Sequence, residues 1–222
     1  MKKIFLLATA FAVVAFSSCS DDKKSGDPAA KNYSIKSTYA GWQYFSISEG
    51  KVVGTGKAEY TSDELEAGAS YTSTESGARA TTDDLSWFAE TNWDFAIYKY
   101  YIRTNSGDDM DGLGGIYQCP STVAFADIKK VPADAVFEED EELTYTGMGL
   151  PFVSVQSEYW AMRFKQKPDG SGPEMPPVYL KPDGVYIIRS ANGQKYYKVE
   201  FTQYTHSSDN GLVGFRVLEI SK

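Results

Sequence analysis

The chain has 222 residues, of which 42% are hydrophobic and 14% aromatic, and its formal net charge is −8. This length suits one domain with a tail, and the apolar content is sufficient for a core. The acidic balance argues against nucleic acid as a partner, because binding to phosphates needs basic side chains. Sixteen tyrosines against four tryptophans favour a β-rich protein.

The N-terminal residues 1–18 have the pattern of an export signal. Lys2 and Lys3 precede an apolar run over residues 4–16, which is shorter than a typical transmembrane helix. The run leads into Phe-Ser-Ser-Cys, which looks like a bacterial lipoprotein signal in which Cys19 becomes the lipidated first residue. An ordinary secretory signal with an incidental cysteine is the alternative interpretation.

The mature chain begins with a polar stretch. Residues 19–31 contain glycine and proline among charged side chains, so we expect a lipidated, flexible tether. Residues 32–222 are then one domain. Within it, residues 58–84 are rich in Ser, Thr, Glu and Gly without periodicity, which predicts an insertion or a long loop.

Strand patterns dominate the domain. Residues 44–47 and 51–53 are separated by Ser-Glu-Gly and predict a short hairpin. Residues 92–102, NWDFAIYKYYI, are apolar on both faces and predict one central strand. The glycine-rich loop that follows, which contains Gly107, Gly112, Gly114 and Gly115, is expected to allow positive φ and close backbone approach.

The C-terminal part shows the clearest turn signal. Residues 185–188 and 196–201 flank Asn192-Gly193 and predict a hairpin, and residues 212–220 predict a final strand. A long helical period, a heptad pattern and an internal repeat are all absent from the sequence. We therefore predict an all-β fold, a single antiparallel β-sandwich-like domain with long loops and at most short helices.

Catalytic patterns are missing. His206 is the single histidine, and without a GxSxG motif a hydrolytic triad is nearly excluded. A zinc site has too few His and Cys candidates, and no phosphate-binding loop is present. Cys119 has no nearby histidine in the sequence, which favours a buried core role. The acidic run 138–142 is expected to be a solvated loop rather than a metal site. We predict that the protein is not an enzyme.

Several segments resemble one family when they are taken together. They are WDFAIYKYYIRTNSG with its glycine loop at 93–115, WQYFS at 42–46 with GKVV at 50–53, VYIIR at 185–189 and YKVEF at 197–201. In this order they closely resemble the HmuY family of haem-binding surface lipoproteins from Bacteroidetes.

The resemblance implies a haemophore. Such a protein is anchored by lipid to the outer membrane, exposed on the cell surface and in some cases shed or secreted. It takes haem from host or community proteins and passes it to a TonB-dependent receptor of the outer membrane. The acidic residues behind Cys19 also resemble the signal that sends lipoproteins of these bacteria to the surface.

The axial ligands of the haem iron must differ from those of the founding member of the family, which uses two histidines, because this chain has one. Met148 and Met175 occupy the region in which the family places its ligands, and other members resemble this chain in using methionine there. Both methionines are in Gly- or Pro-containing turns, where binding residues gather. Met110 ranks third, and Met162 is expected to be a core residue.

A pair of thioether ligands has a predictable chemistry. Two soft, neutral sulphur ligands should favour ferrous over ferric iron. Tyr145, Phe152 and Tyr179 are candidates for the walls of the haem pocket.

Two other classes of function stay open. A glycan-binding or adhesive surface lipoprotein would use exposed aromatic platforms, for which the candidates are Trp42, Trp87, Trp93 and Trp160. Trp42 and Trp93 belong to strands that we expect to be buried, which weakens this alternative. The third class is a purely structural or interaction module on the surface.

Overall fold

The structure is a computed structural model. It describes residues 29–37, 39, 41–56, 71–74, 77–81, 86–147 and 150–222, with the backbone alone at 71–74, 77–81, 142, 144–147 and 150–153. The described strands are β1 (Lys31–Lys36), β2 (Trp42–Ser46), β3 (Lys51–Gly56), β4 (Tyr71–Thr74), β5 (Gly77–Thr81), β6 (Phe95–Tyr98), β7 (Tyr101–Thr104), β8 (Gly115–Gln118), β9 (Glu141–Gly147), β10 (Leu150–Gln156), β11 (Arg163–Phe164), β12 (Tyr179–Leu180), β13 (Tyr186–Arg189), β14 (Tyr196–Thr205) and β15 (Leu212–Ile220). A 3-10 helix, η1, spans Phe125–Asp127.

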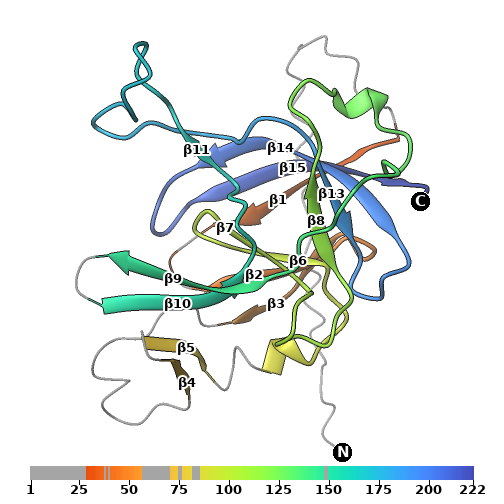
Figure 1. Cartoon of the computed structure of the whole chain (residues 1–222), viewed down its shortest axis with the longest axis horizontal. Helices are drawn as coiled ribbons and strands as arrows, with labels where there is room; N and C mark the ends of the chain where they lie inside the picture. Colours follow the sequence, from red (N-terminus) through yellow and green to blue (C-terminus); the bar gives the residue numbers. More distant parts are fainter. Residues whose placement is uncertain are drawn as a thin grey trace, which may run out of the picture.

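Two sheets make the body of the domain (Figure 1). One has the strand order β1-β15-β14-β13-β8 and the other the order β3-β2-β6-β7. They pack face to face through a core cluster to which both contribute, for example Phe45, Phe95 and Phe215, whose rings contact one another at centroid distances of 5.2–5.5 Å. The predicted all-β sandwich is confirmed.

Further clusters cover the outer faces of both sheets. Trp42, Tyr44 and Trp93 pack with Val155 of β10 on the far side of the smaller sheet. Cys119 and Phe125 belong to a third cluster that covers the larger sheet. Central strands therefore bury both of their faces, which is why β6 shows apolar residues at consecutive positions.

The prediction of one continuous strand over residues 92–102 is wrong. Residues 95–104 form a hairpin of β6 and β7, in which Ile97 pairs with Ile102 and Tyr98 with Tyr101. Lys99 and Tyr100 make the turn, and Lys99 has a φ of 51°. The sequence carries no Gly, Asn or Pro at this point, so the pattern gave no signal for a turn. Burial on both faces is confirmed for both strands.

The glycine-rich loop behaves as predicted. Gly107 has a φ of 92°, and a Cβ at Gly112 would lie 2.2 Å from Oδ1 of Asn105. The Asn105 amide group donates hydrogen bonds to the backbone carbonyls of Glu90 and Trp93 at 2.7 and 3.0 Å. The loop is thus held closely against the entry to β6.

The two predicted hairpins and the final strand are confirmed. β2 pairs with β3, and β13 pairs with β14 across the turn at Gly193, where φ is 70°. β15 spans the predicted residues 212–220. β11 covers only Arg163 and Phe164, and an isolated bridge between Tyr101 and Trp160 precedes it.

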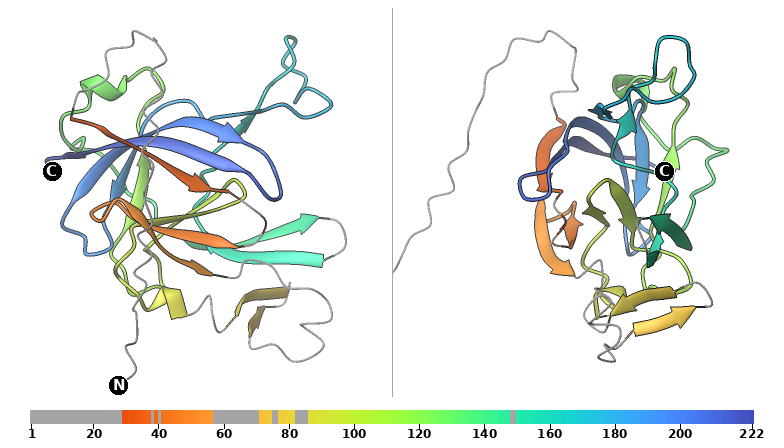
Figure 2. Two further views of the ribbon diagram at one scale, coloured as in Figure 1. Left: turned by 180° about the vertical axis from the view of Figure 1, so that it is seen from behind. Right: turned by 90° about the vertical axis from the view of Figure 1, so that its left-hand side faces the viewer.

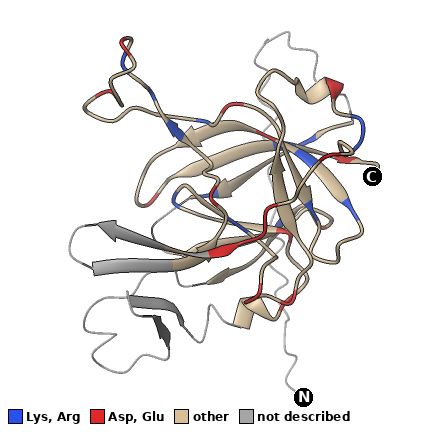
Figure 3. Cartoon of the chain, in the orientation of Figure 1, with Lys and Arg blue, Asp and Glu red and all other residues tan. Residues whose placement is uncertain are grey.

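The acidic run at residues 138–142, whose last two residues begin β9, is only partly a solvated loop. Glu138, Glu139 and Glu141 are exposed, and Figure 3 shows acidic residues in red along the segment that leads into β9. Asp140 is instead 4% exposed, and its carboxylate accepts hydrogen bonds from the backbone N–H and the hydroxyl of Thr104, both at 2.8 Å. Burial raises the pKa of Asp140 to about 8. The charge pattern could not reveal this partner on β7.

The segment 58–84 contributes secondary structure. It contains β4 and β5, and Ala78 of β5 pairs in parallel with Phe152 of β10. The predicted signal peptide at 1–18, Cys19 and most of the predicted tether lie outside the described residues. In the described part of the chain, no helix has the length and apolar character to span a membrane.

Candidate functional site

Two extensions leave the body of the domain on the same side. Figures 1 and 2 show the β9–β10 hairpin and the segment between β11 and β12 extending in this direction. Leu150 of β10 pairs with Gly147 of β9, so residues 148 and 149 connect the two strands. Met148, one of the two predicted ligands, therefore belongs to this connection and lies outside the described residues. The side chains of Tyr145 and Phe152 are likewise not described.

The second extension, residues 165–178, has its own internal hydrogen bonds. The backbone N–H of Lys165 donates to Val178 and that of Glu174 donates to Lys165, both at 2.9 Å. An ion pair between Lys165 and Glu174 at 2.9 Å joins the same two sides, and Gln166 forms a bridge with Pro173. These contacts join the two sides of the extension, so it is an ordered segment. We call residues 165–178 the finger.

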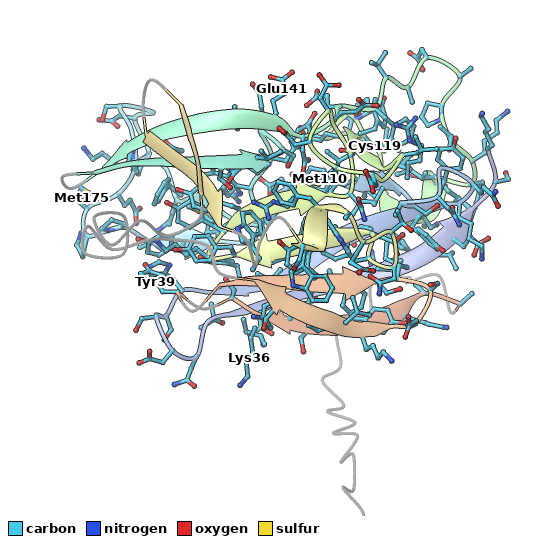
Figure 4. The ribbon with its side chains drawn as sticks, turned by 90° about the horizontal axis from the view of Figure 1, so that it is seen from below. Lys36, Tyr39, Met110, Cys119, Glu141 and Met175 are labelled. Carbon is cyan, nitrogen blue, oxygen red and sulfur yellow. The ribbon has the colours of Figure 1, made fainter. Side chains whose placement is uncertain are left out.

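Met175 is presented by this finger. Its side chain is 73% exposed, whereas Met110 is 7% and Met162 is 3% exposed. Met110 packs into the core cluster around Trp42 and Trp93, so it is a core residue. Figure 4 shows Met110 within the body of the domain and Met175 at its end. The prediction that Met162 is a core residue is confirmed.

An aromatic cluster lies at the root of the finger. The ring of Tyr179, the first residue of β12, stacks on His206 with centroids 4.0 Å apart and planes 11° apart. The hydroxyls of Tyr39 and Tyr204 are 3.2 Å from the two ring nitrogens of His206. Partial burial, and then the positive charge of Lys99, lower the pKa of His206 below its ordinary value.

Lys99 connects this cluster to the β6–β7 turn. Its Nζ lies 4.3 Å from the ring centroid of Tyr39 and 4.9 Å from that of Tyr98. Next to Lys99 in the turn, Tyr100 packs on Trp160 with ring centroids 5.1 Å apart. The result is a mostly half-buried aromatic cluster that includes one lysine and extends from the β6–β7 turn to β12.

Sequence reasoning placed neither His206 nor Lys99 at the site. His206 lies far from Met148 and Met175 in the sequence, but folding brings it onto Tyr179. Lys99 lies within residues 92–102, which were predicted to be one continuous strand. Of the predicted wall residues, Tyr179 is at the root of the finger and half-buried.

The tryptophans do not make an exposed platform. Trp42 and Trp93 are fully buried, as predicted, and Trp87 and Trp160 are half-buried. Trp87 stacks on Tyr44 at 4.9 Å and donates a hydrogen bond to Thr55. Among the side chains that the structure describes, Tyr39 is the one large aromatic group that is exposed, at 44%. A flat aromatic strip for stacking on sugars is therefore absent from the described surface.

The remaining chemical candidates are elsewhere. Cys119 is 3% exposed and burial raises its pKa to about 11, which confirms the core role. In the parts of the chain that are described, no three His, Cys, Asp or Glu side chains gather as a metal site. A cavity of about 220 Å³ between β1, β14 and β15 includes Tyr33, Lys195 and Tyr197 but none of the methionines.

Comparison with known proteins gives one family. The model of a family described as HmuY protein matches residues 38–216. A crystal structure of a candidate lipoprotein from Bacteroides fragilis NCTC 9343 is 18% identical, with a TM-score of 0.51 and coverage of 86% of this chain and 89% of that chain. Apo PinO from Porphyromonas gingivitis is 15% identical, with a TM-score of 0.49 and coverage of 86% and 97%. No curated protein matches.

Proposed function

The chain belongs to the HmuY family, whose model matches most of its length, and from this premise we propose that it is a haem-binding surface lipoprotein with Met148 and Met175 as axial ligands. The protein is then a carrier and not an enzyme. Haem is its cargo, held between two extensions of one β domain.

The exposure of Met175 supports this proposal most strongly. A methionine that fills a core is buried, as Met110 and Met162 are, yet Met175 is 73% exposed. It also belongs to the finger, whose two sides are joined by backbone hydrogen bonds and by the Lys165–Glu174 ion pair. An exposed soft ligand on an ordered support is suited to haem iron.

Met148 supplies the second ligand in this proposal. The pairing of Leu150 with Gly147 leaves two residues to connect β9 and β10, and Met148 is one of them. The β9–β10 hairpin extends on the same side of the domain as the finger (Figure 1). Haem that bridges the two extensions would receive one thioether on each face.

A haem titration tests the proposal. The soluble chain from residue 20 onward is titrated with haem, oxidised and dithionite-reduced, while visible absorption is recorded for wild type, Met148→Ala and Met175→Ala. Met162→Leu serves as a matched control, because it alters a buried methionine and leaves the exposed one intact. We expect a saturable one-to-one Soret shift that each alanine variant weakens and the control preserves.

Two results would count against it. The absence of a saturable change in either redox state would remove haem as the ligand. A shift that survives both alanine substitutions would keep haem and overturn the choice of ligands.

The cellular context is part of the same proposal. Lipidation of Cys19 anchors the protein in the outer membrane, facing outward, and the protein passes haem from host or community proteins to a TonB-dependent receptor. A Cys19→Ala variant should then leave the membrane fraction and appear as soluble protein. Retention of that variant in the membrane fraction would contradict lipid anchoring.

A further inference from the structure

The finger takes its orientation from its root. Every residue from 165 to 178 is exposed except Gly172 and Glu174, which are half-buried. At the root, Phe164 and Tyr179 are half-buried, pair with each other between β11 and β12, and have ring centroids 5.4 Å apart. The exposed residues have little packed surface to restrain them, so the packing at the root decides where the finger lies.

His206 connects that root to the body of the domain. Its imidazole lies flat on the ring of Tyr179, with centroids 4.0 Å and planes 11° apart. The Nε2 atom is 3.2 Å from the hydroxyl of Tyr39, and the Nδ1 atom is 3.2 Å from that of Tyr204. The backbone N–H of Tyr39 donates in turn to the carbonyl of Ser208 at 3.1 Å. Contacts at both edges of the imidazole therefore fix the plane on which Tyr179 rests.

A neutral imidazole suits this arrangement. It has one N–H donor and one acceptor nitrogen, so one tyrosine hydroxyl donates to the ring and the other accepts from it. Burial, and then the positive charge of Lys99, lower the pKa of His206, which keeps the ring neutral near pH 7. A phenyl ring at this position would stack on Tyr179 but would form neither hydrogen bond.

A continuous series of contacts runs from Tyr179 to the proposed ligand. Val178, the residue before Tyr179, accepts a hydrogen bond from the backbone N–H of Lys165 at 2.9 Å. The carbonyl of Lys165 accepts one from the N–H of Glu174 at 2.9 Å, and the two side chains form an ion pair at 2.9 Å. Met175 is the next residue. Because the finger is bonded internally, it should move as one unit when its root tilts.

A small tilt at the root is sufficient to displace the ligand. Tyr179 is four residues after Met175. Four residues reach at most about 14 Å, so a tilt of roughly 5° displaces Met175 by up to about 1 Å. A pre-organised binding site holds its groups to within about 0.5 Å of the productive geometry. Restraint at the root is therefore needed for the thioether to be in place before haem arrives.

We propose that His206 is a positioning residue for Met175, because by holding Tyr179 in place it sets where the finger presents the thioether to the haem iron. The inference rests on the proposed haem function and deepens it by adding a residue that acts through the finger and does not ligate the iron. A ligand that is already held in place loses less conformational entropy on binding, so this restraint should raise the affinity for haem.

The first measurement follows the finger without haem. Nitroxide labels are placed on Met175→Cys and Lys51→Cys in a Cys119→Ala background of the chain from residue 20 onward. Pulsed electron paramagnetic resonance then gives the distribution of distances between the finger and β3, where Lys51 is exposed. The same protein is made with His206→Ala, His206→Phe or Thr205→Ala, and circular dichroism checks that each variant folds. Thr205 is the matched control, because it is the exposed neighbour of His206 on β14.

The second measurement titrates ferrous haem into the unlabelled chain and its His206→Ala, His206→Phe and Thr205→Ala variants. We expect His206→Ala to broaden the distance distribution and to weaken haem binding about tenfold, the scale of a stacked aromatic pair. His206→Phe should broaden the distribution less and lose less affinity, because its ring still stacks on Tyr179. Thr205→Ala should match the parent chain in both measurements.

The outcomes separate this inference from the haem function. An unchanged distance distribution or an unchanged haem affinity in His206→Ala would overturn the positioning role and leave the haem function intact. Equal losses in His206→Ala and His206→Phe would also overturn it, because the stack on Tyr179 would then not be what holds the finger. Failure of the parent chain to bind haem would remove the haem function itself, and the positioning role with it.

Discussion

Tyr179 and His206 stack with ring centroids 4.0 Å apart, although they are 27 positions apart in the sequence. Tyr179 begins β12 at the root of the finger, and His206 follows β14. The contact therefore ties the finger that carries Met175 to one of the longest strands of the larger sheet. The contact between Tyr179 and His206 therefore fixes the position from which Met175, the proposed ligand, can reach the haem.

His206 offers a direct measurement on this contact, because it is the single histidine in the chain. Partial burial and the charge of Lys99 lower its pKa, so its ring should titrate below the ordinary 6.5 in an NMR experiment. As the pH falls, His206 therefore binds its proton at a lower pH in the folded state than in the unfolded state. This contribution to stability is present above pH 6.5 and is lost as the pH falls below that value.

The same titration reports on Lys99. Lys99→Gly removes the nearby positive charge, so the His206 pKa should move upward, while Lys51→Ala should leave it in place. The groups that face the imidazole are Tyr39, Tyr179, Tyr204 and Lys99. An unchanged midpoint in Lys99→Gly would show that the two side chains are not coupled in solution.

Local sequence signals predicted much of the fold. Asn192-Gly193 predicted a hairpin turn, which has the positive φ that glycine permits, and residues 212–220 form the predicted final strand. The turn at Lys99 had no such signal, because tertiary contacts, including that of Ser37, hold an unfavourable residue there. Asp140 was misassigned for a related reason, since Thr104, its partner, lies 36 residues earlier in the chain.

The candidate site was predictable only in part. The Gly- and Pro-containing turns around Met148 and Met175 pointed to the two extensions, and the expected core position of Met162 is confirmed. The aromatic cluster at the root of the finger combines residues from β12, the β6–β7 turn and the end of β14. Such an assembly depends on long-range packing, which a local pattern does not encode.

Replacement of Met175 by histidine should lower the reduction potential of the bound haem. A neutral imidazole stabilises ferric iron better than a thioether does, and axial ligands tune haem over about 0.8 V. Spectroelectrochemical titration of wild type and Met175→His measures the shift. Wild type should also bind ferrous haem more tightly than ferric haem. A ferric affinity equal to or above the ferrous one would contradict ligation by two thioethers.

Asp140 should give the protein a stability that declines as the pH rises. Burial raises its folded pKa to about 8, above the ordinary 3.8. Between these values the unfolded chain releases a proton that the folded chain retains, so the free energy of unfolding falls with rising pH, by up to a few kcal/mol. Chemical denaturation at a series of pH values measures this slope.

Variants at Asp140 separate its charge from its hydrogen bonds. Asp140→Asn should flatten the slope, because the amide does not ionise. Asp140→Ala should flatten it as well and cost a further ~1–3 kcal/mol, because it leaves the backbone N–H of Thr104 buried without its acceptor. A slope of unchanged size in Asp140→Asn would assign it to another group.

Cys119 should react with thiol reagents only when the domain opens. It is 3% exposed, and burial raises its pKa to about 11, so the thiolate is scarce and shielded near neutral pH. From residue 20 onward it is the single cysteine, so the labelled fraction reports on one site. Pulsed alkylation in increasing denaturant should follow the unfolding curve recorded by circular dichroism, and Cys119→Ala should give no label. Rapid labelling without denaturant would show that the cluster of Cys119, Phe125 and Val185 opens locally while the sheets stay folded.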